Sequence, residues 1–205
     1  MKIIGIDVGC TNLALVKAKV NVESNISIDV LFAQMFDLKN IICHAKDCIF
    51  TPGDKSSAHR CHHWVENIHR VFQDTDLILM ERQPLFGLTG IEQSIYIYLK
   101  QRFSDGLASK VRLISPNSMH AFFKMSKNKE ERRCEIVKIT EDYLCEIRAF
   151  QVAKEKDHLA DAFGFILFYT QSILTQKHSM ARSTFQKFKY NINTTTYIKK
   201  SKYFT

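Results

Sequence analysis

Three acidic side chains interrupt segments that are otherwise apolar, and these residues are the best suited to chemistry. Asp7 lies within the apolar segment 2–8, Glu81 directly follows the apolar segment 77–80, and Asp161 lies between two alanines. A carboxylate in such surroundings is costly unless it is paired or holds a cation. Oxygen ligands suit Mg²⁺, and two such ions about 3.5–4 Å apart can clamp a phosphodiester for hydrolysis. The three residues are therefore candidate Mg²⁺ ligands.

The acidic residues also have structural interpretations, which the sequence leaves open. Asp7 precedes the turn residues Gly9 and Asn12 and can cap the turn between two strands. Glu81 can form an ion pair with the adjacent arginine, and Asp157 favours the positive end of a helix.

A histidine accompanies the third carboxylate. The segment 157–174 has apolar residues at helical spacing and begins with Asp157 and His158. Residues three and four apart share a helix face, so Asp161 lies beside both of them. Histidine can bind a metal through one ring nitrogen or orient a water molecule, which makes His158 a further candidate ligand.

These candidates must be positioned by an α/β arrangement. Apolar β-type runs followed by alternating helical and strand patterns predict a mixed sheet, three antiparallel strands and then parallel strands, flanked by helices. The predicted strands are 2–8, 13–20, 26–36, 77–80 and 111–115, and the predicted helices are 59–73, 91–103, 116–123, 129–147 and 157–174.

Composition limits the function classes. A chain of 205 residues, 45% of them hydrophobic, is long enough for one domain and too apolar for disorder throughout. No apolar run reaches the ~18 residues of a membrane span, and the first residues make a poor signal peptide. We therefore expect an intracellular protein of a reducing compartment, without a membrane partner and without a disulfide framework for its six cysteines.

The excess positive charge lies almost entirely in residues 176–205. This segment holds seven of the 29 Lys and Arg, including Lys187 and Lys189, and no acidic residue follows Asp161. Without those seven, 22 basic residues face 21 acidic residues. Interleaved aromatic residues favour a nucleic-acid-binding tail after a domain spanning 1–175, although a solubilising, disordered tail fits equally well.

Residues 37–63 form an insert rich in cysteine and histidine. Cys43, Cys48, His59 and Cys61 offer the two pairs of ligands that a tetrahedral zinc needs, and His62 or His63 can replace His59. The spacing is imperfect, so a polar insert with free cysteines is the alternative. The insert is a candidate structural Zn²⁺ site.

Four sequence motifs together resemble the RuvC-type Holliday junction resolvases, most closely the poxvirus, iridovirus and giant-virus branch. The motifs are GIDVGCTNLA with Asp7, ILMERQP with Glu81, ISPNSMHAFF, and KDHLADAF with Asp161. Their order and spacing are specific as a set, and they cover most of residues 1–175. The resemblance implies a ribonuclease H-like fold with a mixed five-stranded sheet.

The resemblance also implies an activity and a site. It predicts a homodimeric endonuclease that uses Mg²⁺, with Mn²⁺ able to substitute, to nick opposed strands of a four-way DNA junction during viral recombination or replication, in the host cytoplasm or nucleus. Asp7, Glu81 and Asp161 correspond to the family's metal ligands. His158 stands where relatives often have aspartate, so its role in metal binding and catalysis is an expectation, with Asp157 as a supporting residue.

The family pattern further includes cations and an aromatic residue near the scissile phosphate. Lys127, Lys129, Arg132 and Arg133 are the candidates to hold phosphates, although a solvated helix end would carry the same charges. Phe86 can stack on bases at the junction centre, but an aromatic residue is more often part of a core.

Other functions fit part of the pattern. IGIDVGCTN also matches the phosphate loop of actin-like ATPases, but those proteins need a second half and a second glycine-rich loop. A RuvC-like nuclease acting on other branched DNA or on RNA precursors is a closer alternative. A junction-binding architectural protein with weak catalysis is another, because His158 replaces an expected carboxylate.

Overall fold

The computed structural model describes residues 1–22, 26–41, 48, 56–84, 89–102 and 110–174. The chain divides into two units, Met1–Phe168 and Tyr169–Thr205. The first unit contains every strand of the described sheet and the candidate site. The described part of the second, Tyr169–Leu174, is a π-helical segment.

A five-stranded mixed sheet forms the centre of the first unit. Its strands are β1 (Lys2–Val8), β2 (Asn12–Asn21), β3 (Ser27–Asp37), β4 (Leu77–Glu81) and β5 (Val111–Ile114). Their order is β3-β2-β1-β4-β5, with β1, β2 and β3 pairing antiparallel and β1, β4 and β5 pairing parallel. This arrangement confirms the predicted α/β fold and places β1 and β4 side by side at its centre.

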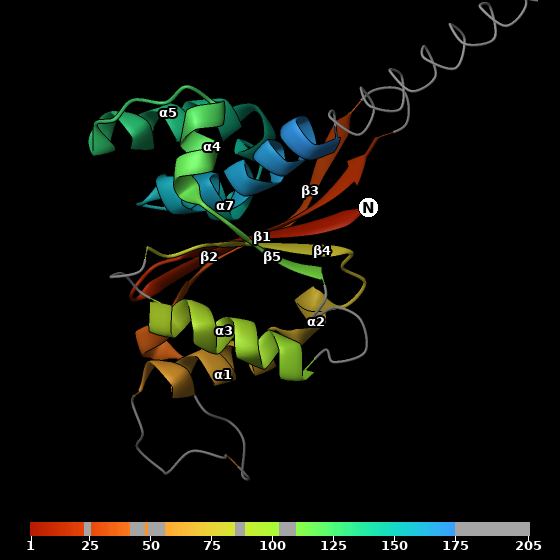
Figure 1. The fold of residues 1–205 in the computed structure, drawn as a ribbon, viewed down its shortest axis with the longest axis vertical. Coiled ribbons are helices and arrows are strands. Elements are labelled where there is room, and N and C mark those ends of the chain that lie inside the picture. The colour runs from red at the N-terminus through yellow and green to blue at the C-terminus, as the bar shows by residue number, and fades with distance from the viewer. Residues whose placement is uncertain (23–25, 42–47, 49–55, 85–88, 103–109, 175–205) are drawn as a thin grey trace, which may run out of the picture. The chain divides into compact units, whose positions relative to one another are not determined.

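Helices cover both faces of the sheet, which gives three layers (Figure 1). One face carries α1 (Ser57–Asn67), α2 (His69–Phe72) and α3 (Thr89–Arg102), and the other carries α4 (Pro116–Phe122), α5 (Lys129–Leu144) and α7 (Lys156–Phe168). A short helix, α6 (Arg148–Val152), connects α5 to α7, and a 3₁₀ turn, η1 (Leu38–Asn40), follows β3. Among the described residues, no helix combines the length and apolar character that crossing a bilayer requires.

Three helix predictions differ from the structure. The predicted helix 59–73 is divided at Ile68, whose φ of −110° and ψ of 14° interrupt the helical backbone between α1 and α2. The predicted helix 129–147 ends at Leu144, and α6 follows as a separate helix. The regular α-helix predicted for 157–174 ends at Phe168.

The two faces are packed differently. On the α1 and α3 face, aromatic and aliphatic side chains such as Trp64, Phe72 and Ile95 form a buried core with β1 and β4. On the other face, α7 packs directly on β1, where Gly5 permits the close approach: a Cβ atom there would overlap the carbonyl oxygen of Ala162. This contact holds the start of α7 near the end of β1.

Candidate active site

Asp7 and Glu81 meet at the carboxyl ends of the two central strands. The parallel register pairs Ile6 of β1 with Met80 of β4, so the next residue of each strand is the acidic one. The Val8 amide donates a hydrogen bond of 3.0 Å to Oε2 of Glu81. Ligands of parallel sheets gather at this edge, and the structure brings the two predicted carboxylates there.

The first turns of α7 bring His158 and Asp161 to the same edge. His158 Nδ1 lies 2.6 Å from Oδ2 of Asp7, which is 7% exposed. We define the acidic site as Asp7, Glu81, His158 and Asp161. All four were predicted from the sequence, and three separate elements assemble them.

Burial and mutual repulsion shape the charges of the acidic site. Burial raises the pKa of Glu81 to about 9, and the neighbouring carboxylates of Asp7 and Asp161 add to the effect. Burial likewise raises the pKa of Asp161 to about 8, with further repulsion from Asp7. The hydrogen bond to Asp7 raises the pKa of His158. A divalent cation would relieve this repulsion, so the donor set fits Mg²⁺ or Mn²⁺.

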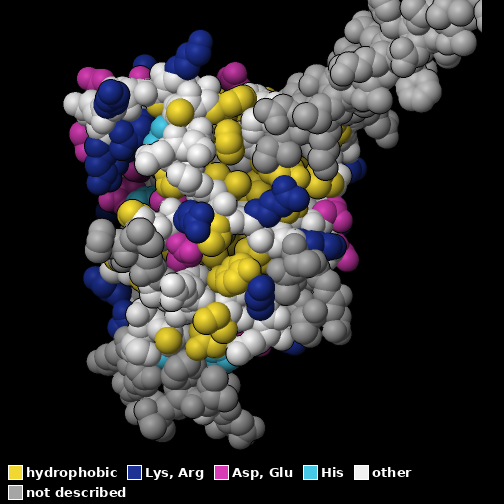
Figure 2. Space-filling model, in the orientation of Figure 1, with side chains coloured by type: hydrophobic (Ala, Val, Ile, Leu, Met, Phe, Trp, Pro, Cys, Tyr) yellow, Lys and Arg dark blue, Asp and Glu magenta, His cyan; other side chains and the backbone are white. Residues whose placement is uncertain are grey.

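The acidic site opens into a cavity of about 860 Å³ with one basic wall. The start of α5 contributes Lys129, Arg132 and Arg133 to the lining, and α4 contributes His120. Lys and Arg side chains gather over the region of α5, close to acidic and histidine side chains (Figure 2). A wall of this charge beside an acidic site suits a phosphate group that approaches the carboxylates.

Three solved structures with a similar fold are Holliday junction resolvases or RuvC. The fowlpox virus resolvase, solved with a Holliday junction DNA substrate, has a TM-score of 0.57 and 16% identity, covering 85% of this chain and 99% of that one. The yeast mitochondrial Holliday junction resolvase has a TM-score of 0.54 and 21% identity, covering 80% and 75%. RuvC from Thermus thermophilus has a TM-score of 0.53 and 15% identity, covering 83% and 96%.

This chain has the fold of the Holliday junction resolvases. No family model and no curated protein matches its sequence. Because the three solved structures are only 15–21% identical to this chain, the likeness shows the fold alone. The role of each side chain must be argued from this chain itself.

Within this resolvase fold, the predicted cations are not equivalent. The Arg133 Nε lies 3.0 Å from Oδ2 of Asp157, so this arginine is held by a carboxylate beside the acidic site. Arg132 donates a hydrogen bond of 2.9 Å to the carbonyl oxygen of Lys127, whose own side chain is not among those that line the cavity. Lys129 and Arg132 are the better placed of the predicted phosphate ligands.

Sequence reasoning missed the role of Gln83, whose side chain bonds to Glu81 and to the end of β1; we call this arrangement the glutamine clamp. Gln83 Nε2 donates to Oε2 of Glu81 at 2.7 Å and to the Val8 carbonyl oxygen at 2.8 Å. The backbone N–H of Gln83 donates to Oε2 of Glu92, a glutamate only 8% exposed. The available signal was the polar sequence ERQP directly after a buried strand.

The zinc prediction requires a correction. Cys61 is fully buried in the core with Trp64, away from the other predicted ligands, and burial raises the pKa of its thiol to about 12. The structure instead brings together Cys48, His59 and His63, a group that could bind a metal. We define these three residues as the Cys/His cluster.

Several predicted residues lie outside the described part of the chain. Their predicted roles in zinc binding or DNA binding remain predictions: these residues are Cys43, Phe86, Lys187 and Lys189.

Proposed function

We propose that the chain is a structure-selective endonuclease that cuts four-way DNA junctions by metal-dependent hydrolysis. One observation carries the proposal: in a resolvase fold, three carboxylates from the ends of β1 and β4 and the first turns of α7 line the same cavity as a basic wall. The fowlpox neighbour was solved with Holliday junction DNA, which supports the same substrate class here.

Asp7, Glu81 and Asp161 would hold Mg²⁺, or Mn²⁺ in its place. When bound, such ions supply activated water and stabilise the 3′-oxygen that leaves. The carboxylates must be ionised to serve as ligands, and Gln83 fixes the orientation of Glu81. Lys129 and Arg132 would hold the phosphates of the strand that is cut.

His158 would act beside the metal ligands. Its Nδ1 faces Asp7, and its Nε2 lies 3.6 Å from Oε2 of Glu155. In this orientation the ring can position the Asp7 carboxylate and exchange a proton at Nε2 with solvent. Asp157 keeps Arg133 at the edge of the site through their ion pair.

We further propose that the protein acts as a homodimer on recombining or replicating viral DNA. A four-way junction has two opposed strands to cut, and a two-fold dimer would present one acidic site to each. The fowlpox resolvase is a viral protein, which agrees with a viral setting; the host cytoplasm or nucleus as its location stays a prediction.

Cleavage of a synthetic, end-labelled four-way junction tests the proposal, with a linear duplex of the same sequence as control. We expect paired nicks in the junction with Mg²⁺, no cleavage with EDTA, and no comparable cleavage of the duplex. Equal cleavage of the duplex, or full activity in EDTA, would contradict it.

The contact between His158 and Asp7 favours one second candidate, a junction-binding architectural protein. The 2.6 Å contact occupies an oxygen of Asp7 that a cation would use. If this bond persists on DNA, the protein binds the junction without cutting it in either Mg²⁺ or Mn²⁺. Restored cleavage on His158→Asp would then show that this side chain alone accounts for the loss.

A further inference from the structure

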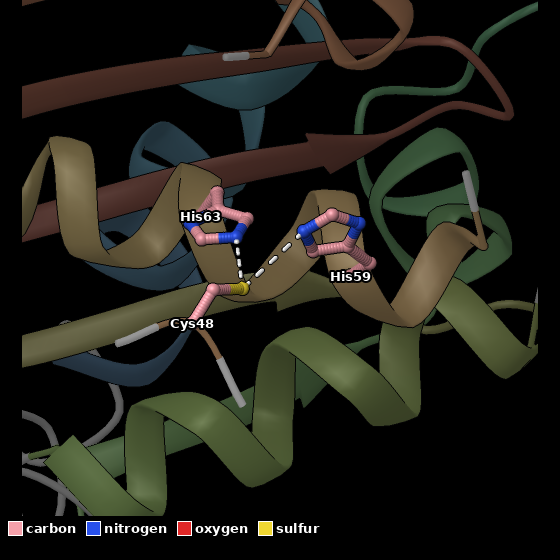
Figure 3. Close-up of side chains that lie close together, drawn as sticks. All are labelled: Cys48, His59 and His63. Carbon is pink, nitrogen blue, oxygen red and sulfur yellow. Dashed lines mark hydrogen bonds between the residues drawn. The ribbon is translucent and has the colours of Figure 1, made fainter. Parts of the chain in front are cut away.

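The Cys/His cluster lies apart from the acidic site and has no part in the proposed cleavage. His59 and His63 are four residues apart on α1, which places both imidazoles on one helix face. Both rings project toward the sulfur of Cys48 (Figure 3). The Nε2 atoms lie 3.6 Å (His59) and 3.2 Å (His63) from that sulfur.

The separations match those of a shared tetrahedral metal. Zinc binds cysteine sulfur at about 2.3 Å and histidine nitrogen at about 2.0–2.1 Å, so two such ligands at a tetrahedral angle lie about 3.5 Å apart. One donor atom from each of the three residues lies within 4.8 Å of the other two. The observed sulfur–nitrogen distances of 3.2 and 3.6 Å fall on either side of that value.

The chemistry of the donors selects the metal. One thiolate and two imidazole nitrogens form the mixed sulfur and nitrogen set that zinc prefers, whereas Mg²⁺ requires oxygen ligands. His63 is 4% exposed and Cys48 is half-buried, so a cation here would be largely withdrawn from solvent. We propose that Cys48, His59 and His63 bind a zinc ion.

The position of the cluster indicates what the zinc would do. α1 packs against α3 on the face of the sheet opposite α7 (Figure 1), and its residues Cys61 and Trp64 enter the core. A metal held by His59 and His63 would fasten Cys48 to this helix. Zinc would therefore stabilise the α1–α3 layer and take no direct part in cleavage.

Metal content of the untagged full chain is the first test. Protein is expressed with zinc, exchanged into metal-free buffer, and analysed by inductively coupled plasma mass spectrometry. We expect about one zinc per chain in the wild type, and roughly tenfold less in Cys48→Ser, His59→Gln and His63→Gln. Cys145→Ser and His69→Gln serve as matched controls and keep the zinc, because both residues lie outside the cluster.

The acidic site needs its own control, because its histidine and carboxylates are also possible zinc ligands. Asp7→Asn should retain the zinc if the metal is held by the Cys/His cluster. Loss of zinc in Asp7→Asn, with full zinc in Cys48→Ser, would overturn the proposal. So would a wild type that contains no zinc and shows no change in melting temperature when zinc is added.

Two measurements on the wild type, the Co²⁺ spectrum and the melting temperature, test the proposal even if a variant folds poorly. Co²⁺ added to metal-free wild type should give the thiolate charge-transfer band of a cysteine-bound ion, absent from Cys48→Ser and present in Cys145→Ser. Zinc, and not Mg²⁺, should raise the melting temperature of metal-free wild type. An equal rise in Cys48→Ser would contradict the assigned ligands, whatever the outcome of the cleavage assays.

Discussion

The acidic site and the Cys/His cluster both suit metals, but the fold assembles them in opposite ways. The acidic site draws on β1, β4 and α7, which are far apart in the sequence, and it opens into a cavity with a basic wall. The Cys/His cluster comes from 16 consecutive positions, and one helix provides two of its three side chains. The first is built from hard oxygen ligands that approach a substrate, and the second from nitrogen and sulfur that fasten one segment to a helix.

The difference extends to stability. Carboxylates brought together and buried repel one another, so the acidic site costs the protein stability until a cation arrives. The Cys/His cluster contains no carboxylate, so this repulsion is absent from it. Variants of the acidic site should therefore change DNA cleavage, whereas variants of the Cys/His cluster should change zinc-dependent stability.

The largest effect should come from removing a carboxylate of the acidic site. Glu81→Gln should lower the rate of junction cleavage by roughly 10³-fold or more. A bound metal ion supplies several kcal/mol of transition-state stabilisation, and each loss of about 1.4 kcal/mol lowers the rate tenfold. The measurement is single-turnover cleavage at saturating protein. Glu66→Gln, which alters an exposed ion pair with Arg102, is the matched control and should cleave normally. Retained activity in Glu81→Gln would remove this residue from the site.

The basic wall should contribute to DNA binding. Lys129→Gln combined with Arg132→Gln should weaken junction binding by about 10- to 100-fold and reduce the slope of log K against log salt by about 2, since each phosphate contact contributes about 0.9. Fluorescence anisotropy in Ca²⁺ or EDTA measures both quantities. Lys138→Gln, an exposed cation on the same helix that is not among the lining residues, should change neither. An unchanged salt slope in the double variant would contradict the proposed phosphate contacts.

Removing a carboxylate should stabilise the metal-free protein. The pKa of Asp161 is about 8 in the folded chain against 3.8 as its ordinary value. The folded state therefore binds the proton more tightly, and stability falls as pH rises from about 4 to 8. Asp161→Asn should raise the free energy of unfolding in EDTA at pH 8 by about 1–2 kcal/mol, with little gain at pH 4.

Urea unfolding at both pH values provides the measurement. The raised pKa of His158 acts in the same direction, because that stability is also lost as pH rises, so His158 must be retained in both proteins. Mg²⁺ should stabilise the wild type more than Asp161→Asn. A variant that is less stable than the wild type in EDTA at pH 8 would contradict the repulsion argument.

The smallest expected effect concerns the glutamine clamp. Gln83→Leu should lower kcat by about 3- to 10-fold and leave junction affinity unchanged, because the side chain orients Glu81 and does not touch DNA in this account. Gln83→Leu should also need a higher Mg²⁺ concentration than the wild type for half-maximal activity, which would show that Gln83 positions a metal ligand. Gln151→Leu, on α6, is the control. Equal losses in both variants would indicate a general loss of stability.

Much of the fold and of the acidic site could be predicted from the sequence, because both depend on strong local patterns. An acidic residue at the end of an apolar strand is conspicuous, and the parallel pairing of β1 with β4 brings Asp7 and Glu81 together. The mixed sheet followed from three apolar strand segments with short connections and the later alternation of helices and strands, whereas the strand order came from the structure. Both inferences use periodicity, which the sequence carries directly.

The sequence-based predictions were wrong where several nearby residues had suitable side chains and only tertiary packing decides which of them is used. Cys61 and His63 both lie on α1, and ligand spacing alone does not show that the cysteine turns into the core while the histidine turns toward Cys48. The break at Ile68 has no proline or glycine to mark it. Gln83 gains its importance from contacts with Glu81 and Glu92 that only the folded chain creates.

The most direct test of the central claim is cleavage of a supercoiled plasmid that extrudes a cruciform. Two coordinated nicks at the four-way junction convert the plasmid to a linear product, whereas isolated nicks leave an open circle. We expect linear product with Mg²⁺ from the wild type and from Cys145→Ser, and neither linear nor open-circle product from Asp7→Asn. Tight binding of the cruciform by the wild type with no cleavage in Mg²⁺ or Mn²⁺ would contradict the proposed endonuclease activity and identify an architectural protein.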